Sequence, residues 1–137
     1  MLKTAVQTTV IAAAIAASAG AASAGAAMAA NASLSGDALR SAIADKTVVL
    51  KISGFELPIQ YSARGTMTGR MSTVAAAFSG NKGVSDRGKW WVDGNRLCQK
   101  WSSWMDGETY CYALSQKGSQ VRWVRNDGRS GSARIAG

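Results

Sequence analysis

Two cysteines behind a predicted export signal constrain this chain more than any other feature. Cys98 and Cys111 are its only cysteines, and a lone pair in an exported protein is expected to form a disulfide. They lie among short β-rich runs separated by Asp-Gly and Lys-Gly turns, which is the pattern of β-hairpins. The sequence therefore predicts a small β domain with one cross-strand disulfide between Cys98 and Cys111.

The N-terminal segments follow the order of a secretory signal peptide. A short positive start precedes a mostly apolar run at 6–18, and two small-residue cleavage patterns follow at 22–24 and 27–29. An uncleaved membrane anchor is the alternative, but the alanine-rich run is only weakly apolar and favours cleavage. We expect residues 1–29 to be the signal and cleavage region, and residues 30–137 to form one periplasmic or secreted domain.

The remaining chain predicts a short helix followed by a β meander. Residues 33–44 place Leu34, Ala38, Leu39 and Ile43 on one helical stripe. Pro58 confines its segment to an edge or to a strand start. Strands are expected at 47–52, 60–63, 66–73, 90–92, 96–101, 108–115, 120–125 and in a last segment that ends near residue 135. The expected fold is mainly β, a single antiparallel meander curled into a small barrel or sandwich.

The cysteine pair also predicts the register of two hairpins. Opposing Cys98 with Cys111 places Leu97 opposite Tyr112 and Lys100 opposite Thr109. A second hairpin, turned at Lys117-Gly118, places Tyr112 opposite Trp123 and Leu114 opposite Val121. Because side chains alternate between faces along a strand, one face becomes apolar, with Leu97, Tyr112, Leu114, Val121 and Trp123. The opposite face carries Cys98, Cys111, Ala113, Arg96, Lys100, Arg122 and Val124.

The residue types argue against catalysis. The chain contains no histidine, which removes Ser-His and Cys-His nucleophile systems and most zinc sites. Asp106 and Glu108 are close enough in sequence to form an acid/base pair, but a solvated loop explains them better. No glycine-rich loop follows a strand and opens a helix. We expect a protein that is not an enzyme, uses no cofactor and binds no metal.

Charge and aromatic residues point to binding instead. The net charge is +8, which attracts anionic surfaces or simply keeps the protein soluble. Basic residues alternate with tryptophans, whose indole rings stack on sugars and bases. Trp104, in a loop at 102–107, is the tryptophan most expected to be exposed. The candidate ligand-binding residues are Arg96, Lys100, Trp101, Trp104 and Arg122.

Two kinds of partner fit this set of residues. The first is an anionic polymer or glycan of the cell envelope, held by the basic residues and the tryptophan loop. The second is another exported protein whose cleft accepts the loop at 102–107, as an inhibitor would be accepted. Nucleic acid fits the charge but conflicts with the predicted export.

Three segments resemble a family of small exported bacterial proteins of unknown function: GKWWVDGNRLCQKW, YCYAL and VRWVRNDGR. The shared pattern is a G-x-W entry to a strand, then L-C-x-x-W, and a second cysteine one hairpin later. The matching positions are those of packing and of the disulfide, namely Trp90, Leu97, Cys98, Trp101, Cys111 and Tyr112. The resemblance implies a bacterial periplasmic or secreted setting and no catalytic residue.

Overall fold

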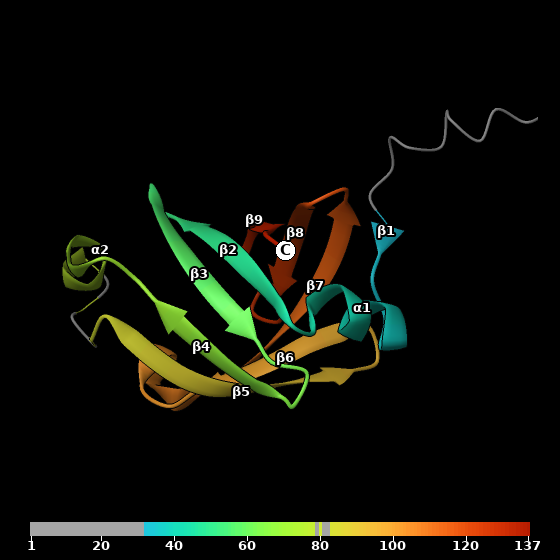
Figure 1. Ribbon diagram of the computed structural model, residues 1–137, viewed down its shortest axis with the longest axis horizontal. Coiled ribbons are helices and arrows are strands. Elements are labelled where there is room, and N and C mark those ends of the chain that lie inside the picture. The colour runs from blue at the N-terminus through green and yellow to red at the C-terminus, as the bar shows by residue number, and fades with distance from the viewer. Residues whose placement is uncertain (1–31, 79, 81–82) are drawn as a thin grey trace, which may run out of the picture.

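The computed structural model describes residues 32–78, 80 and 83–137, which form a closed eight-stranded antiparallel barrel. Successive strands pair with one another, and β9 closes the barrel by pairing with β2 (Figure 1). The strands are β2 (Lys46–Ile52), β3 (Phe55–Tyr61), β4 (Thr66–Arg70), β5 (Ser85–Asp93), β6 (Arg96–Trp101), β7 (Thr109–Lys117), β8 (Gln120–Arg125) and β9 (Ser130–Ile135). The predicted mainly β meander is confirmed as a barrel, whereas the predicted signal peptide lies outside the described residues.

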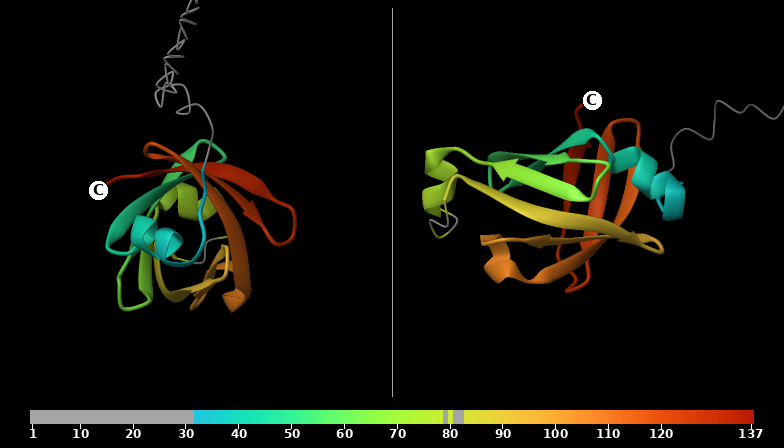
Figure 2. Two further views of the ribbon diagram at one scale, coloured as in Figure 1. Left: turned by 90° about the vertical axis from the view of Figure 1, so that its right-hand side faces the viewer. Right: turned by 60° about the horizontal axis from the view of Figure 1, so that its bottom comes forward.

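Short elements complete the barrel. The two-residue strand β1 (Ala32–Ser33) pairs with β7, and a 3-10 helix, η2 (Trp104–Gly107), connects β6 to β7. Helices α1 (Gly36–Ile43) and α2 (Thr73–Phe78) lie at opposite ends of the barrel (Figures 1 and 2). The predicted N-terminal helix is therefore present but shorter than expected. The strand predicted at 66–73 ends earlier, because α2 begins at its last position.

Helix α1 covers one end of the barrel with its apolar stripe. Leu39 and Ile43 are 0% and 1% exposed and join the core, whereas Ala38, expected on the same stripe, is exposed. The Arg40 guanidinium lies 5.2 Å from the ring centre of Trp90 and donates to the carbonyl of Ala63 at 2.6 Å. Apolar packing and this cation–π contact together hold α1 against the barrel wall.

Two strand boundaries differ from the sequence expectation. The strand predicted at 60–63 is the end of β3, which begins at Phe55 and runs through Pro58. Pro58 faces Val49 on β2, whereas pairing with β4 begins only at Ile59, so the proline has a strand neighbour on one side. This local edge tolerates a residue that has no backbone N–H. Strand β5 begins at Ser85, five residues before the strand predicted at 90–92.

The register of the disulfide hairpin is confirmed. Cys98 pairs with Cys111, Leu97 with Tyr112 and Lys100 with Thr109, and the two cysteines form a disulfide. The next hairpin turns one residue later than predicted, at Gly118-Ser119.

This later turn corrects the predicted pairs by two positions. Leu114 faces Trp123, and Tyr112 faces Arg125. A shift of two residues preserves the face on which each side chain lies. The predicted apolar face therefore remains correct: Leu97, Leu114 and Val121 are buried in the core, and Tyr112 and Trp123 pack against it.

The core fills the barrel between α1 and the cavity described below. Its residues come from the segment between β1 and α1, from α1 itself, from the inward positions of the strands and from η2. They are Leu34, Leu39, Ile43, Val48, Leu57, Ile59, Tyr61, Met67, Trp90, Leu97, Trp101, Trp104, Leu114, Val121 and Ala133. The small barrel is thus packed at the α1 end, and its space for a ligand lies toward α2.

Candidate functional site

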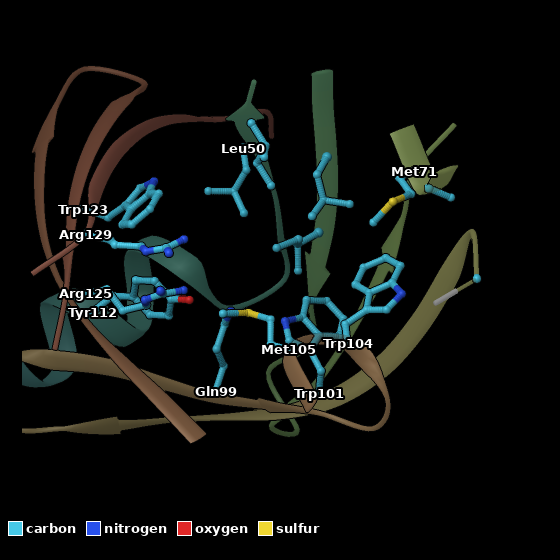
Figure 3. A pocket seen from close by; sticks show the side chains of 15 residues that line it. Leu50, Met71, Gln99, Trp101, Trp104, Met105, Tyr112, Trp123, Arg125 and Arg129 are labelled. Atoms are coloured by element: carbon cyan, nitrogen blue, oxygen red, sulfur yellow. The ribbon is translucent and has the colours of Figure 1, made fainter. Parts of the chain in front are cut away.

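A cavity of about 280 Å³ lies inside the barrel toward the α2 end (Figure 3). Most of its wall is apolar: Leu50, Leu57 and Ile59 come from β2 and β3, and Met71 follows β4. Its polar groups are the side chains of Gln99, Tyr112, Arg125 and Arg129, and three tryptophans, Trp101, Trp104 and Trp123, complete the wall. The site is an apolar chamber with a polar side formed by β6, β7 and the β8–β9 hairpin.

Glycines in the barrel wall make room for these indole rings. A Cβ atom at Gly69 would lie 2.6 Å from Trp104 and 2.8 Å from Trp101, and a Cβ atom at Gly131 would lie 2.5 Å from Trp123. Real Cβ atoms do not approach other atoms so closely, so glycine at these positions lets the rings lie close against β4 and β9. The tryptophans thereby line the cavity rather than fill it.

Among the described residues, Gln99 is the one buried polar residue, with an exposed fraction of 5%. The Tyr61 hydroxyl donates to Gln99 Oε1 at 2.9 Å, and burial raises the pKa of Tyr61 well above its usual range. Burial also raises the pKa of Tyr112, whereas interactions with Arg125 and Gln99 lower it. Both tyrosines therefore remain neutral hydrogen-bonding groups at physiological pH.

The β8–β9 hairpin places two guanidinium groups and one carboxylate at the cavity. Arg125 Nε donates to Asp127 Oδ1 at 2.8 Å, and its guanidinium lies 4.4 Å from the ring centre of Tyr110. The backbone N–H of Arg129 also donates to Asp127, at 3.2 Å. Arg129 lines the cavity as well, so this side of the chamber has a net positive charge.

These contacts predict an acid-sensitive ion pair. Hydrogen bonding from Arg125 lowers the pKa of Asp127 from 3.8 to about 2. Because the pKa of the folded state is the lower one, the pair stabilises the fold above about pH 4, and its contribution is lost as the pH falls through about 2. An NMR titration of the Asp127 carboxyl carbon should give this low pKa.

The Arg125→Gln variant should return the pKa of Asp127 toward its ordinary value. Arg134→Gln is the matched control, because Arg134 pairs with Glu56 at 3.2 Å on the outer surface, and it should leave the titration unchanged. An ordinary pKa for Asp127 in the unaltered protein would contradict the pairing.

Two buried donors in the cavity wall have no acceptor. The indole nitrogens Nε1 of Trp104 and Trp123 are buried and form no hydrogen bond within the described part of the chain. A buried donor without a partner costs about 1–3 kcal/mol.

The structure separates the predicted ligand-binding residues into two groups. Arg96 and Lys100 are exposed on the outer face of β6, and Arg122 is exposed on β8, with β7 between them. Trp101 and Trp104 are inside the barrel, at 3% and 6% exposure. The expectation that Trp104 is exposed is therefore wrong, and no single surface presents all five residues.

The loop at 102–107 folds against the barrel. Asp86 on β5 accepts hydrogen bonds from the backbone N–H groups of Ser103 and Trp104, each at 2.8 Å. The Trp104 ring packs against Trp101 with ring centres 4.8 Å apart and an angle of 51° between the ring planes. Asp86 and the burial of the indole thus convert a loop that looked free in the sequence into part of the cavity wall.

Sequence analysis missed the polar side of the cavity. The alternation that places Leu97 and Trp101 inside the barrel also places Gln99 there, and the alternation along β8 places Arg125 inside after Val121 and Trp123. Polar residues at inward positions of a strand are unusual and need a partner. Gln99 and Arg125 at inward positions are therefore the sequence feature that could have indicated the polar side of the cavity.

Two further features bear on the class of protein. The described residues contain no cluster of three or more His, Cys, Asp or Glu side chains able to hold a metal ion. None of the helices within the described ranges combines the length and hydropathy of a membrane span. The disulfide is weak evidence for an oxidising, exported location.

Comparison with protein-family models, with curated proteins and with solved structures gives no match to this chain. The resemblance to small exported bacterial proteins therefore stays a prediction. Fold and site define the molecule as a small disulfide-bonded β-barrel with an apolar internal cavity.

Proposed function

We propose that this protein is an exported binding protein that holds one small, largely apolar ligand inside its barrel. The carrying observation is the cavity of about 280 Å³, which is lined mainly by inward-facing residues of the strands and by η2. Eight-stranded barrels are just wide enough to be filled by side chains or to hold one small ligand. Here Gly69 and Gly131 leave room for the tryptophan rings against the barrel wall, and part of the interior remains unfilled.

The chemistry of the wall suggests the class of ligand. A volume of about 280 Å³ lies at the lower end of ligand pockets, which favours a small molecule. Leu50, Leu57 and Ile59 offer an apolar surface, whereas Arg125 and Arg129 outweigh Asp127 and favour an anion. We infer a medium-chain carboxylate, or a molecule of similar size with an apolar body and one acidic group.

We also propose that the protein is exported and that it is not an enzyme. The predicted signal peptide and the disulfide support a periplasmic or secreted location. Among the described residues that line the cavity there is no carboxylate or thiol to suit nucleophilic chemistry, and Asp127, which lies beside the cavity, is paired with Arg125. A carrier or scavenger fits these features better than an enzyme.

Calorimetric titration with octanoate and octanol tests the proposal. Both should bind, with octanoate the tighter, because only its carboxylate interacts with the guanidinium groups. Arg129→Gln should weaken octanoate binding about fivefold, since a partly exposed charge pair contributes about 1 kcal/mol, and should leave octanol binding unchanged. Leu57→Phe adds volume to the wall and should weaken the binding of both molecules.

Lys51→Gln is the matched control, because Lys51 is exposed on β2 and outside the cavity wall. It should bind octanoate like the unaltered protein. Unfolding curves establish that each variant is folded. Undiminished binding of both molecules to folded Leu57→Phe would exclude the cavity as the binding site.

A further inference from the structure

The outer surface of β5 and β6 presents a second set of residues suited to binding. Lys89 lies directly opposite Lys100, Trp91 opposite Cys98, and Asp93 opposite Arg96. Apart from Cys98, the side chains of these pairs are exposed. Alternation places all of them on the outside of the barrel, on the far side of the wall from the cavity.

Trp91 is the exposed tryptophan of this protein. It is 39% exposed, whereas Trp90, Trp101 and Trp104 are buried and Trp123 is partly buried against the core. Its cross-strand neighbour Cys98 is bonded to Cys111 on β7. The disulfide ties β6 to β7 beside the indole, so the ring projects from a rigid part of the sheet rather than from a loop.

The charges around Trp91 have one predominant sign. Lys89 and Lys100 repel each other, because like charges directly opposite on neighbouring strands are destabilising. Arg87 on β5 and Arg96 on β6 are also exposed, and Asp93 is the carboxylate among the outward positions of β5. Packing does not require these exposed cations, whereas a bound anion would relieve their repulsion.

The neighbouring strands add neutral polar groups. Thr66 and Thr68 on β4 lie opposite Lys89 and Arg87, and Thr109 on β7 lies opposite Lys100. Outward positions on one strand recur about every 7 Å, and neighbouring strands lie about 4.8 Å apart. Cations and hydroxyl groups therefore extend from the indole along β5 and across to β4, β6 and β7, which suits an extended chain better than a ligand bound at a single point.

We propose that this Trp91 surface, formed by Arg87, Lys89, Trp91, Arg96 and Lys100, binds an acidic polysaccharide. One pyranose ring stacks on the exposed indole, and the carboxylates of the same and neighbouring sugar units pair with the lysine and arginine side chains. Surfaces for single-stranded nucleic acid usually stack successive bases on several aromatic rings. A single exposed indole beside hydroxyl groups favours a sugar chain.

The proposal is independent of the internal cavity. It retains Arg96 and Lys100 from the sequence prediction and adds Arg87, Lys89 and Trp91. It omits Trp101 and Trp104, which are buried, and Arg122, which lies on β8 beyond β7. Variants of the Trp91 surface should therefore bind octanoate like the unaltered protein. Loss of one kind of binding without the other distinguishes the two sites.

Titration with polygalacturonate, a polymer of uronic acid, tests the proposal. Binding should weaken steeply with salt and should protect Trp91 from quenching by acrylamide. Trp91→Leu keeps an apolar cover on the disulfide but removes the aromatic ring, and it should reduce affinity about tenfold or more. The double variant Lys89→Gln with Lys100→Gln should reduce affinity at least as much.

The matched control is Lys51→Gln with Lys117→Gln, which removes two exposed lysines from other parts of the surface and should bind polygalacturonate almost normally. Equal losses in the control and in the double variant of Lys89 and Lys100 would overturn the proposal, because they would indicate attraction by net charge alone. Unchanged binding to folded Trp91→Leu would also overturn it. Tighter binding of oligothymidine than of polygalacturonate would replace the polysaccharide with nucleic acid.

Discussion

Replacing Trp104 by alanine is expected to lower the free energy of unfolding by about 3–5 kcal/mol, the usual cost of truncating a buried tryptophan. The ring is 6% exposed and packs against Trp101, so the variant loses both buried area and an aromatic contact. For a domain of this size the melting temperature should fall by roughly 10 °C or more. Thermal unfolding followed by circular dichroism measures the change.

Trp91→Ala is the matched control, since it removes the same side chain from an exposed position of the same protein. Its melting temperature should fall much less. Similar small losses in both variants would mean that Trp104 lies in a free loop, as the sequence suggested, and would contradict the barrel interior described here.

Removing the disulfide is the second change with a large expected effect. The bridge closes a loop with a sequence separation of 13 residues, which corresponds to about 3 kcal/mol in the chain-entropy account. Replacing Cys98 and Cys111 by alanine together should lower the melting temperature by roughly 10 °C. The β-sheet circular dichroism spectrum at low temperature should be unchanged, because the hairpin register is also fixed by apolar pairs.

Reduction of the unaltered protein provides the control for this double variant. Dithiothreitol should lower the melting temperature of the unaltered protein toward that of the variant and should not affect the variant itself. Equal melting temperatures for the oxidised protein and the double variant would show that the bridge contributes nothing to stability.

Local patterns predicted most of the fold because the relevant interactions are close in sequence. The hairpin between β6 and β7 follows from two cysteines and from the alternation of Leu97 and Tyr112 with polar neighbours. The second hairpin was misplaced because Gly118 was taken as the second central residue of the turn, whereas it is the first, with φ of 58°, and glycine is favoured there in a type II′ turn. Apolar alternation rejects a shift of one residue but accepts a shift of two.

The candidate sites depend on long-range contacts, which local patterns do not contain. Trp104 follows a strand and looks free, and it becomes buried because Asp86 holds its backbone and Gly69 leaves room for its ring. Neither partner is near it in the sequence. Trp91 is exposed for the converse reason: its neighbour Trp90 takes the inward position on β5, so only the register of the strand decides which ring faces the solvent.

The closure of the barrel by β2 and β9 has a consequence for how the chain reaches its folded state. Val48 to Leu50 pair with Ala133 to Ile135, which come from almost opposite ends of the folded domain. During synthesis β2 is made early, and its free edge stays unpaired until β9 has been made. The neighbouring hairpins can form locally, whereas this one distant pairing has a large loop-closure cost, so closure of the barrel is expected to be the slow step of folding. An incomplete chain would therefore expose two open sheet edges to other copies, so aggregation of nascent or truncated chains is the hazard that this architecture carries.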